Sequence, residues 1–243
     1  MKTEFFINNR AKFAERMDDY STAVFFSGKA KRESADQHYP FSVDRNFFYL
    51  TGIDREDMVL TISKIGGKTE ETLYIPPVDE HFEKWYGILM RKEEARETSG
   101  IKNVENRNDF LDKFAGKLSS SDGPDNVYIF SYITDADEPE DSYRGLAHWL
   151  RDKFPAINIK NSLDIMIELR SSKTEEEVEE IKTAIGYTRE ALEFVMKNLK
   201  PGMYEYQARA HFEYQLMLRN SRPGFPTIGA SGPNAVILHY VDL

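Results

Sequence analysis

The stretch SLDIMIELRSSKTEEE, Ser162–Glu177, marks the point where the sequence changes character. After it, apolar or methyl-bearing side chains recur every three or four residues, which is the spacing of one buried stripe on an α-helix. They are Val178, Ile181, Ile185, Thr188, Leu192, Val195 and Leu199. Thr174 suits the N-cap, because its hydroxyl can accept free backbone N–H groups, and Glu175–Glu177 suit the positive end of the helix dipole. We predict a long helix and a domain boundary near residue 165, with domains over 1–165 and 166–243.

The second domain contains few further elements. Pro201 and Gly202 end the long helix, and a second amphipathic helix is expected from Tyr204 to Arg219. The run AVILHYV, Ala235–Val241, predicts a β-strand with alternate residues on one face. Two helices and the start of one sheet cannot bury the apolar stripes, since a layer of helices needs a partner layer. We therefore expect more chain, or another subunit, to cover them.

The first domain alternates between predicted strands and predicted helices, which indicates an α/β layer. The runs of β-forming residues predict strands over 22–28, 46–52, 58–64, 71–77 and 126–132, with a last edge strand over 157–161. Helical patterns cover 4–18, 81–86, 92–98, 108–118 and 142–154. The polar, proline-containing segment 29–45 is expected to be a loop.

Composition excludes several classes of protein. The formal net charge of −9 argues against nucleic acid as a partner, because phosphates demand a basic surface. With no cysteine, the chain has no disulfide, zinc ribbon or thiol nucleophile. The N-terminus lacks the apolar core of a secretory signal, and no stretch approaches the ~20 apolar residues that cross a bilayer. We expect a soluble cytoplasmic protein that binds neither membrane nor nucleic acid.

Four of the five histidines have ordinary structural interpretations. His148 and His211 lie in predicted amphipathic helices, where a surface or core-edge role is far commoner than catalysis. His81 lies among acidic residues in a charged segment, and a solvated turn explains it better than a metal site does. His38 has only Asp36 close by, and one carboxylate with one imidazole does not make a site.

His239 is the candidate site residue, because it lies in the apolar run Ala235–Val241. A titratable ring there either has a buried partner or faces a pocket, and the pattern leaves both readings open. The preceding Ser231–Asn234 is a turn, without the helix or lysine of a phosphate-binding loop and without the pattern of a serine nucleophile. From residue patterns alone, the sequence indicates a two-part α/β protein, with hydrolase as one candidate activity.

The string GFPTIGASGPNAVILHY, residues 224–240, resembles the segment that leads into the catalytic site of Xaa-Pro aminopeptidases and prolidases. Three further stretches are similar to the same family: residues 45–62, 169–192 and 203–228. The resemblance implies an α/β fold class: an N-terminal creatinase-like domain with a mixed sheet flanked by helices, then the truncated beginning of a pita-bread (α+β) peptidase domain. It also implies removal of an N-terminal residue that precedes proline, so the expected partners are peptides with proline at the second position.

The resemblance also implies a chemistry. Family members use two divalent metal ions, usually Mn²⁺, which polarise the imide carbonyl and generate hydroxide. The histidine of the family's LHY motif falls on His239, where it assists the reacting carbonyl or leaving group without binding metal. The first metal aspartate of the family comes after this motif, beyond Leu243, and Asp242 is too close to His239 to be that aspartate. We therefore expect a fragment that has no metal ligand, binds no metal and is inactive alone.

Several alternatives stay open at this point. A prolidase acting on Xaa-Pro dipeptides is a near neighbour of the aminopeptidase. A catalytically dead, creatinase-like protein-interaction module belongs to another class of function. The sequence does not decide whether the chain forms a homo-oligomer, although its apolar stripes predict self-association.

Overall fold

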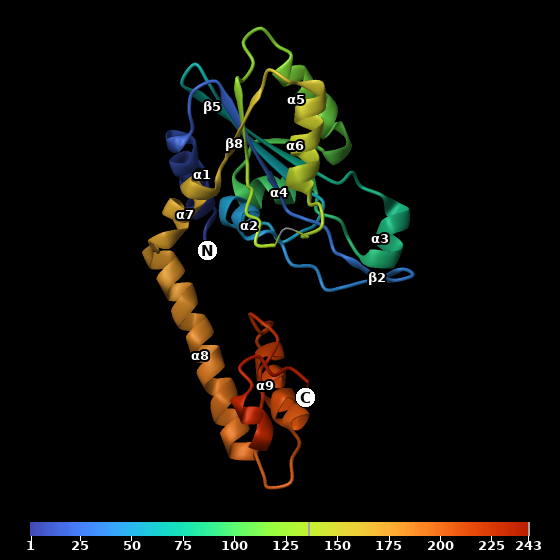
Figure 1. Cartoon of the computed structure of the whole chain (residues 1–243), viewed down its shortest axis with the longest axis vertical. Helices are drawn as coiled ribbons and strands as arrows, with labels where there is room; N and C mark the ends of the chain where they lie inside the picture. The colour runs from blue at the N-terminus through green and yellow to red at the C-terminus, as the bar shows by residue number, and fades with distance from the viewer. Residues whose placement is uncertain (136, 243) are drawn as a thin grey trace. The chain divides into compact units, whose positions relative to one another are not determined.

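The computed structural model describes residues 1–135 and 137–242 of the chain (Figure 1). The chain divides into two compact units, Met1–Ser172 and Lys173–Leu243. The first unit includes the helix α7 (Leu163–Ser171), which spans the sequence-predicted boundary at residue 165. The position of the boundary between the two family domains therefore stays a prediction.

A six-stranded mixed sheet forms the centre of the first unit, in the order β6-β5-β4-β1-β7-β8. β1, β7 and β8 run parallel, β5 and β6 also run parallel, and β4 is antiparallel to both β1 and β5. The strands are β1 (Ser21–Phe26), β4 (Val59–Ile65), β5 (Lys68–Ile75), β6 (Asn103–Asn106), β7 (Asn126–Ile129) and β8 (Asn158–Asn161). The strands expected around residues 22–28, 58–64, 71–77, 126–132 and 157–161 are thus confirmed.

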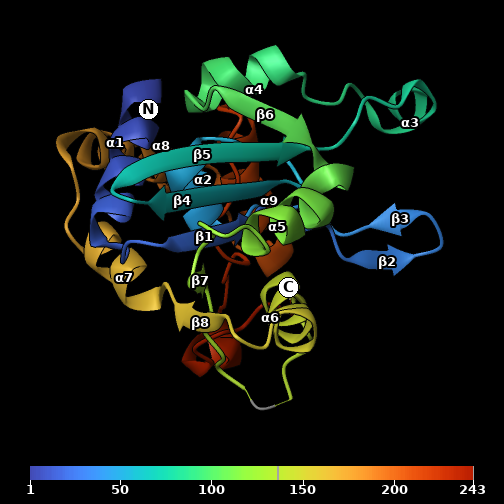
Figure 2. The same cartoon turned by 90° about the horizontal axis from the view of Figure 1, so that it is seen from above.

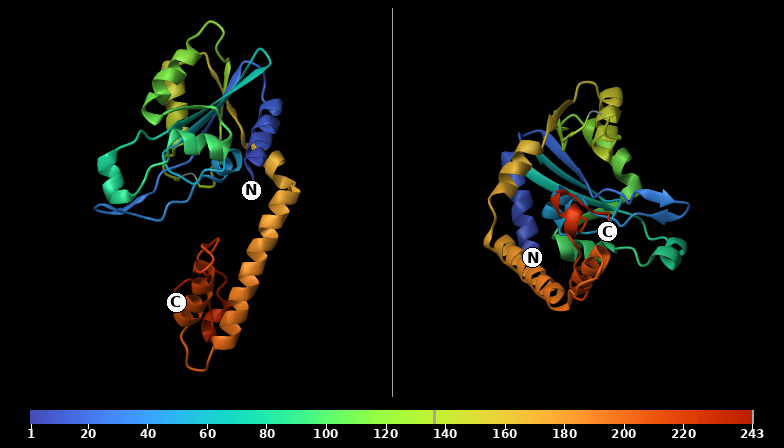
Figure 3. Two further views of the ribbon diagram at one scale, coloured as in Figure 1. Left: turned by 180° about the vertical axis from the view of Figure 1, so that it is seen from behind. Right: turned by 60° about the horizontal axis from the view of Figure 1, so that its bottom comes forward.

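Helices cover both faces of the sheet, because successive strand residues point to opposite sides. Ala23 and Phe25 join one apolar cluster, whereas Val24 and Phe26 join the other. The first cluster includes residues of α1 (Thr3–Arg16), α2 (Arg45–Thr51), α4 (Lys92–Ser99) and α7. The second includes residues of α5 (Phe110–Leu118) and α6 (Ser142–Lys153). α1 and α7, far apart in the sequence, lie side by side (Figures 2 and 3), so the unit has three layers, α/β/α.

The strand predicted over Asn46–Gly52 is wrong, since these residues form α2. The Asp44 carboxylate caps the helix by accepting the backbone N–H of Asn46 at 2.9 Å and of Phe47 at 2.8 Å. The loop predicted over 29–45 contains a short hairpin of β2 (Arg32–Ser34) and β3 (Gln37–His38). The remaining short elements are α3 (Glu80–Tyr86) and the 3₁₀ helix Arg107–Asp109.

Gly52 ends α2 in a conformation that only glycine adopts without strain. Its φ is +72°, and a Cβ added there would lie 2.4 Å from Cε2 of Phe6. We expect Gly52→Ala to lower the free energy of unfolding by at least about 2 kcal/mol, measured by urea denaturation. Gly66→Ala is the matched control, because Gly66 also has a positive φ (+56°) but no atom within 4 Å of an added Cβ. Gly66→Ala should lower the free energy of unfolding by about 1 kcal/mol. Equal losses in the two variants would contradict a steric clash between a Cβ at position 52 and the Phe6 ring.

The second unit is a pair of helices, α8 (Glu175–Asn198) and α9 (Glu205–Met217), followed by a largely irregular segment. Thr174 caps α8 as predicted: its hydroxyl accepts the Glu177 N–H at 3.3 Å, and Glu177 accepts the Thr174 N–H at 2.9 Å. Phe194 of α8 packs on His211 and Tyr214 of α9, with ring centroids 5.6 and 6.1 Å apart. No helix in the described part of the chain is long and apolar enough to cross a membrane.

The strand predicted over Ala235–Val241 is also wrong. Gly232–Val236 forms a 3₁₀ helix, and Ile237–Asp242 contains no regular element. Within the described residues of the second unit there is no strand at all, so the segment has no partner for a backbone ladder. Without a partner strand, the backbone N–H and C=O groups of an apolar, β-forming run form hydrogen bonds within turns or with water instead.

Candidate active-site segment

The segment that carries His239, residues 231–240, is held by one carboxylate of α9. Glu205 lies in the first turn of α9 and accepts hydrogen bonds from the backbone N–H and, at 3.0 Å, the hydroxyl of Ser231. It also accepts the side-chain amide of Asn234 at 3.3 Å, and its carboxylate lies near the hydroxyl of Tyr240. One side chain therefore contacts both ends of the 231–240 segment.

These contacts perturb the pKa values of the groups involved. The Ser231 backbone N–H is the largest cause of a lowered pKa of Glu205, because it stabilises the carboxylate form. Burial raises the pKa of Tyr240, and the negative charges of Glu205 and Asp242 add to this effect. At neutral pH, an ionised Glu205 therefore faces a neutral Tyr240 that can donate its proton in a hydrogen bond.

A second carboxylate holds the preceding part of the segment. Glu213, two turns further along α9, accepts the Thr227 hydroxyl at 2.7 Å and the Arg209 Nε at 2.8 Å. Burial acts to raise the pKa of Glu213, but hydrogen bonds from Thr227 and Arg209 outweigh it, and the pKa is lowered. The chain that follows α9 is thus tied to that helix at two points.

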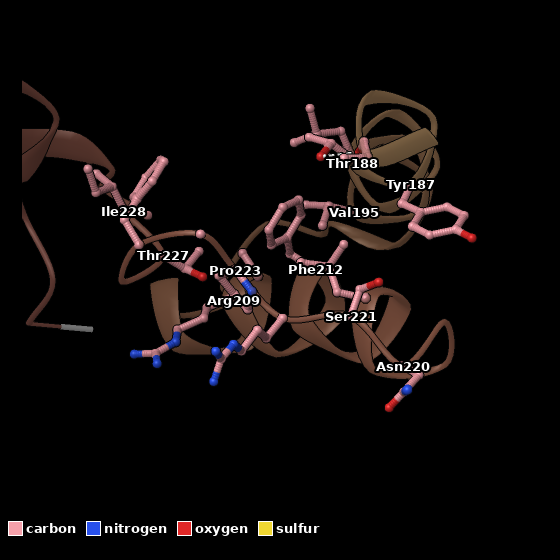
Figure 4. Close-up of a pocket in the computed structure, with 18 residues that line it drawn as sticks. Tyr187, Thr188, Val195, Arg209, Phe212, Asn220, Ser221, Pro223, Thr227 and Ile228 are labelled. Atoms are coloured by element: carbon pink, nitrogen blue, oxygen red, sulfur yellow. Dashed lines mark hydrogen bonds between the residues drawn. The ribbon is translucent and has the colours of Figure 1, made fainter. Parts of the chain in front are cut away.

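Between α8, α9 and residues 220–229 lies a groove of about 880 Å³ (Figure 4). Its walls are mainly apolar: Val195 of α8 and Phe212 of α9 lie next to each other in its wall, and Ile228 lies on the loop side. Arg209 and Arg222 also line this groove. A concave, mainly apolar surface of this kind is suited to bind an apolar segment.

The structure leaves His239 exposed, and it places no hydrogen bond or ion pair on this ring within residues 1–135 and 137–242. The other histidines have the ordinary roles expected for them. His148 lies on the surface with its Nδ1 3.1 Å from Glu140, and His211 packs on Phe194. His81 is exposed in the first turn of α3, and His38 lies in the β2–β3 hairpin. The histidines are not brought together.

The described residues do not fit a metal centre. No group of three or more His, Cys, Asp or Glu side chains in the described ranges is placed to hold a metal ion. Glu205 and Glu213 already accept two or more hydrogen bonds each, so their oxygens are engaged within the protein. Sequence reasoning missed both carboxylates as anchors, because their partners Ser231 and Thr227 lie 26 and 14 residues away with no motif to connect them.

Comparison with known proteins identifies both units. The family described as Aminopeptidase P, N-terminal domain, matches residues 6–128, and Metallopeptidase family M24 matches residues 179–242. The chain is 24% identical over 242 residues to the Xaa-Pro aminopeptidase of Escherichia coli K12, covering 98% of this chain and 54% of that protein. It is 26% identical over 248 residues to the Xaa-Pro dipeptidase of Mus musculus, covering 97% and 48%. It spans about half the length of these curated relatives.

Solved structures agree with this assignment. A protein of Bacillus anthracis assigned to aminopeptidase P superposes with a TM-score of 0.95 at 36% identity, covering 100% of this chain and 58% of the other. The Escherichia coli aminopeptidase P with the inhibitor Pro-Leu superposes with a TM-score of 0.88 at 23% identity, which shows the shared fold. The molecule is thus an aminopeptidase P N-terminal domain joined to the start of an M24 metallopeptidase domain. It belongs to the Xaa-Pro aminopeptidase and prolidase family.

The anchoring role of Glu205 predicts a pH dependence. The pKa of Glu205 is lowered in the folded chain, so its stabilising bonds are present above the unfolded pKa and are lost as pH falls through the folded value. We expect amide hydrogen exchange in residues 231–240 to rise at acid pH, after correction for the intrinsic rate.

Glu205→Gln should raise the amide hydrogen exchange of residues 231–240 at pH 7. Glu193→Gln is the control, because Glu193 is exposed on α8, and it should leave this exchange unchanged. Unchanged protection of residues 231–240 in Glu205→Gln would contradict the anchor.

Proposed function

We propose that this chain is part of a metal-dependent Xaa-Pro aminopeptidase, which removes an N-terminal residue that precedes proline. The chain supplies the N-terminal domain and the first elements of the catalytic domain. Its substrates are peptides with proline at the second position, and its location is the cytoplasm. The observation that supports the proposal most is the match of two successive families, aminopeptidase P and M24, together with similarity to the Escherichia coli Xaa-Pro aminopeptidase over 98% of this chain.

In this proposal, His239 is the residue of this chain that handles a proton at the reacting carbonyl or leaving group. Its exposed ring suits contact with a substrate, and the Glu205 contacts to Ser231 and Tyr240 limit the movement of the segment around it. Divalent metals belong to M24 metallopeptidases as a class. We propose that this chain contributes no metal ligand and is inactive alone.

Prolidase activity is the second candidate, and its support is the similarity to the mouse Xaa-Pro dipeptidase. The rates on an Xaa-Pro dipeptide and on a longer Xaa-Pro peptide separate the two activities. A third reading is a catalytically dead interaction module.

The test is a chimera in which this chain is followed by the remaining residues of the Bacillus anthracis relative, whose matching part is 36% identical. With Mn²⁺ added, the folded chimera should release the first residue of an Xaa-Pro-Xaa peptide and leave an Xaa-Ala-Xaa peptide intact, as followed by mass spectrometry. The 243-residue chain alone should release nothing. A folded, metal-loaded chimera without activity would support the interaction module, and cleavage by the chain alone would contradict our assignment of the ligands.

A further inference from the structure

Glu205 leaves the capping of its own helix to another side chain, although it lies in the first turn of α9. A glutamate near the start of a helix often accepts a free backbone N–H of that helix end. In α9 this bond is made by Gln207, whose Oε1 accepts the Tyr204 N–H at 2.8 Å. The Glu205 carboxylate is therefore available to the turn that precedes His239.

The Glu205 carboxylate holds the turn Ser231–Asn234 through the first and last residues of that turn. It accepts the Ser231 backbone N–H, the Ser231 hydroxyl at 3.0 Å and the Asn234 side-chain amide at 3.3 Å. Hydrogen bonds to an ionised acceptor are stronger than those between neutral groups. Three donors on one carboxylate therefore fix the turn relative to the start of α9.

Backbone hydrogen bonds extend this fixed geometry toward His239. The Asn234 N–H donates to the Ser231 carbonyl at 3.0 Å, and the Ile237 N–H donates to the Asn234 carbonyl at 2.9 Å. These bonds belong to the 3₁₀ helix Gly232–Val236 and its ends. His239 follows Ile237 by two residues, so a displacement of the turn also displaces the chain that carries the imidazole.

We propose that Glu205 is a positioning residue for peptide cleavage: it acts by holding the turn that places the His239 imidazole at the reacting carbonyl or leaving group. This role rests on the proposed function, in which His239 handles a proton. The ionised form of Glu205 holds the turn, and the lowered pKa of this carboxyl keeps it ionised at neutral pH. A misplacement of about 1 Å in a reacting group can lower a rate about 10²-fold.

The first test measures the kinetics of the chimera described above with Glu205→Gln, which keeps the size of the side chain and replaces one acceptor oxygen by a donor. We expect kcat on an Xaa-Pro-Xaa peptide to fall about 10–100-fold, with KM and metal content nearly unchanged. Ser231→Ala should give a smaller fall, because the Ser231 backbone N–H remains as a donor. Glu193→Gln, at an exposed carboxylate of α8, is the matched control and should change nothing.

A double-mutant cycle with His239→Ala separates positioning from a general loss of structure. If Glu205 acts through His239, Glu205→Gln should cost much less in the His239→Ala chimera than in the parent chimera, because residues that act together are not additive. A general structural loss would lower kcat by the same factor in both backgrounds. Circular dichroism and thermal melting verify that each variant is folded.

The possible outcomes distinguish this role from the proposed function. An active parent chimera would overturn the positioning role alone if Glu205→Gln left kcat unchanged, lost metal, or lowered kcat by equal factors in the two backgrounds. A folded, metal-loaded parent chimera without activity would overturn the proposed function and this role together.

Discussion

Replacing Glu71 with alanine is expected to lower the free energy of unfolding by about 3–5 kcal/mol, because it leaves an unpaired buried charge. Its partner Arg10 of α1 is fully buried, with its Nε 2.9 Å from the Glu71 carboxylate on β5. The Arg10 Nη1 also donates to the Leu50 carbonyl of α2 at 2.7 Å. Burial lowers the pKa of Arg10, and Glu71 acts in the opposite direction. The pair thus joins two helices to the sheet.

The geometry predicts an asymmetry between the two partners. The Glu71 side chain is 25% exposed, so it can be hydrated when Arg10 is replaced, whereas Arg10 has no access to water when Glu71 is replaced. Arg10→Met, which keeps the volume, should therefore cost clearly less than Glu71→Ala. Glu70→Ala is the control, because the Glu70–Lys117 pair is exposed and is worth at most about 1 kcal/mol. Urea denaturation measures all three, and equal losses for Glu70 and Glu71 would contradict the role of burial.

The sequence predicts the inner strands of the first unit because β1, β4 and β7 are largely buried on both faces. Val24, Leu60 and Val127 belong to short runs of β-forming residues that predict strands, and the structure confirms them. The prediction failed for Asn46–Gly52, where four apolar or aromatic residues in a row favour a strand by propensity. There the Asp44 cap and the left-handed Gly52 set the ends of a helix, and burial of Phe47 and Leu50 fits one helix face. Local capping outweighed intrinsic preference.

The candidate site was less accessible to prediction, because its contacts join distant residues through single side chains. Glu205 is an ordinary first-turn glutamate by pattern, and only the fold brings Ser231 and Tyr240 to it. The strand predicted around His239 depended on a backbone partner, and none exists among the described residues of the second unit. Motif resemblance located His239 in the sequence. The exposure of its ring and the contacts that anchor its segment are visible only in the three-dimensional structure.

In the chimera described above, His239→Ala is expected to lower kcat on an Xaa-Pro-Xaa peptide by about 10²–10⁴-fold while leaving the metal content unchanged. That range is the usual contribution of a positioned proton-transfer group. The exposed ring and the carboxylate-anchored segment fit a residue that contacts substrate. Turnover is measured by peptide release and metal content by mass spectrometry of the purified protein.

His148→Ala provides the control, because His148 is an exposed histidine of α6 whose Nδ1 lies 3.1 Å from Glu140. It should change neither turnover nor metal content. Loss of metal from His239→Ala would mean that the ring is a ligand, and unchanged turnover would mean that it takes no part in the reaction. If His239 transfers a proton, the pH–rate profile of the parent chimera should contain a step that is absent from the profile of His239→Ala. A merely structural loss would lower the rate by the same factor at every pH.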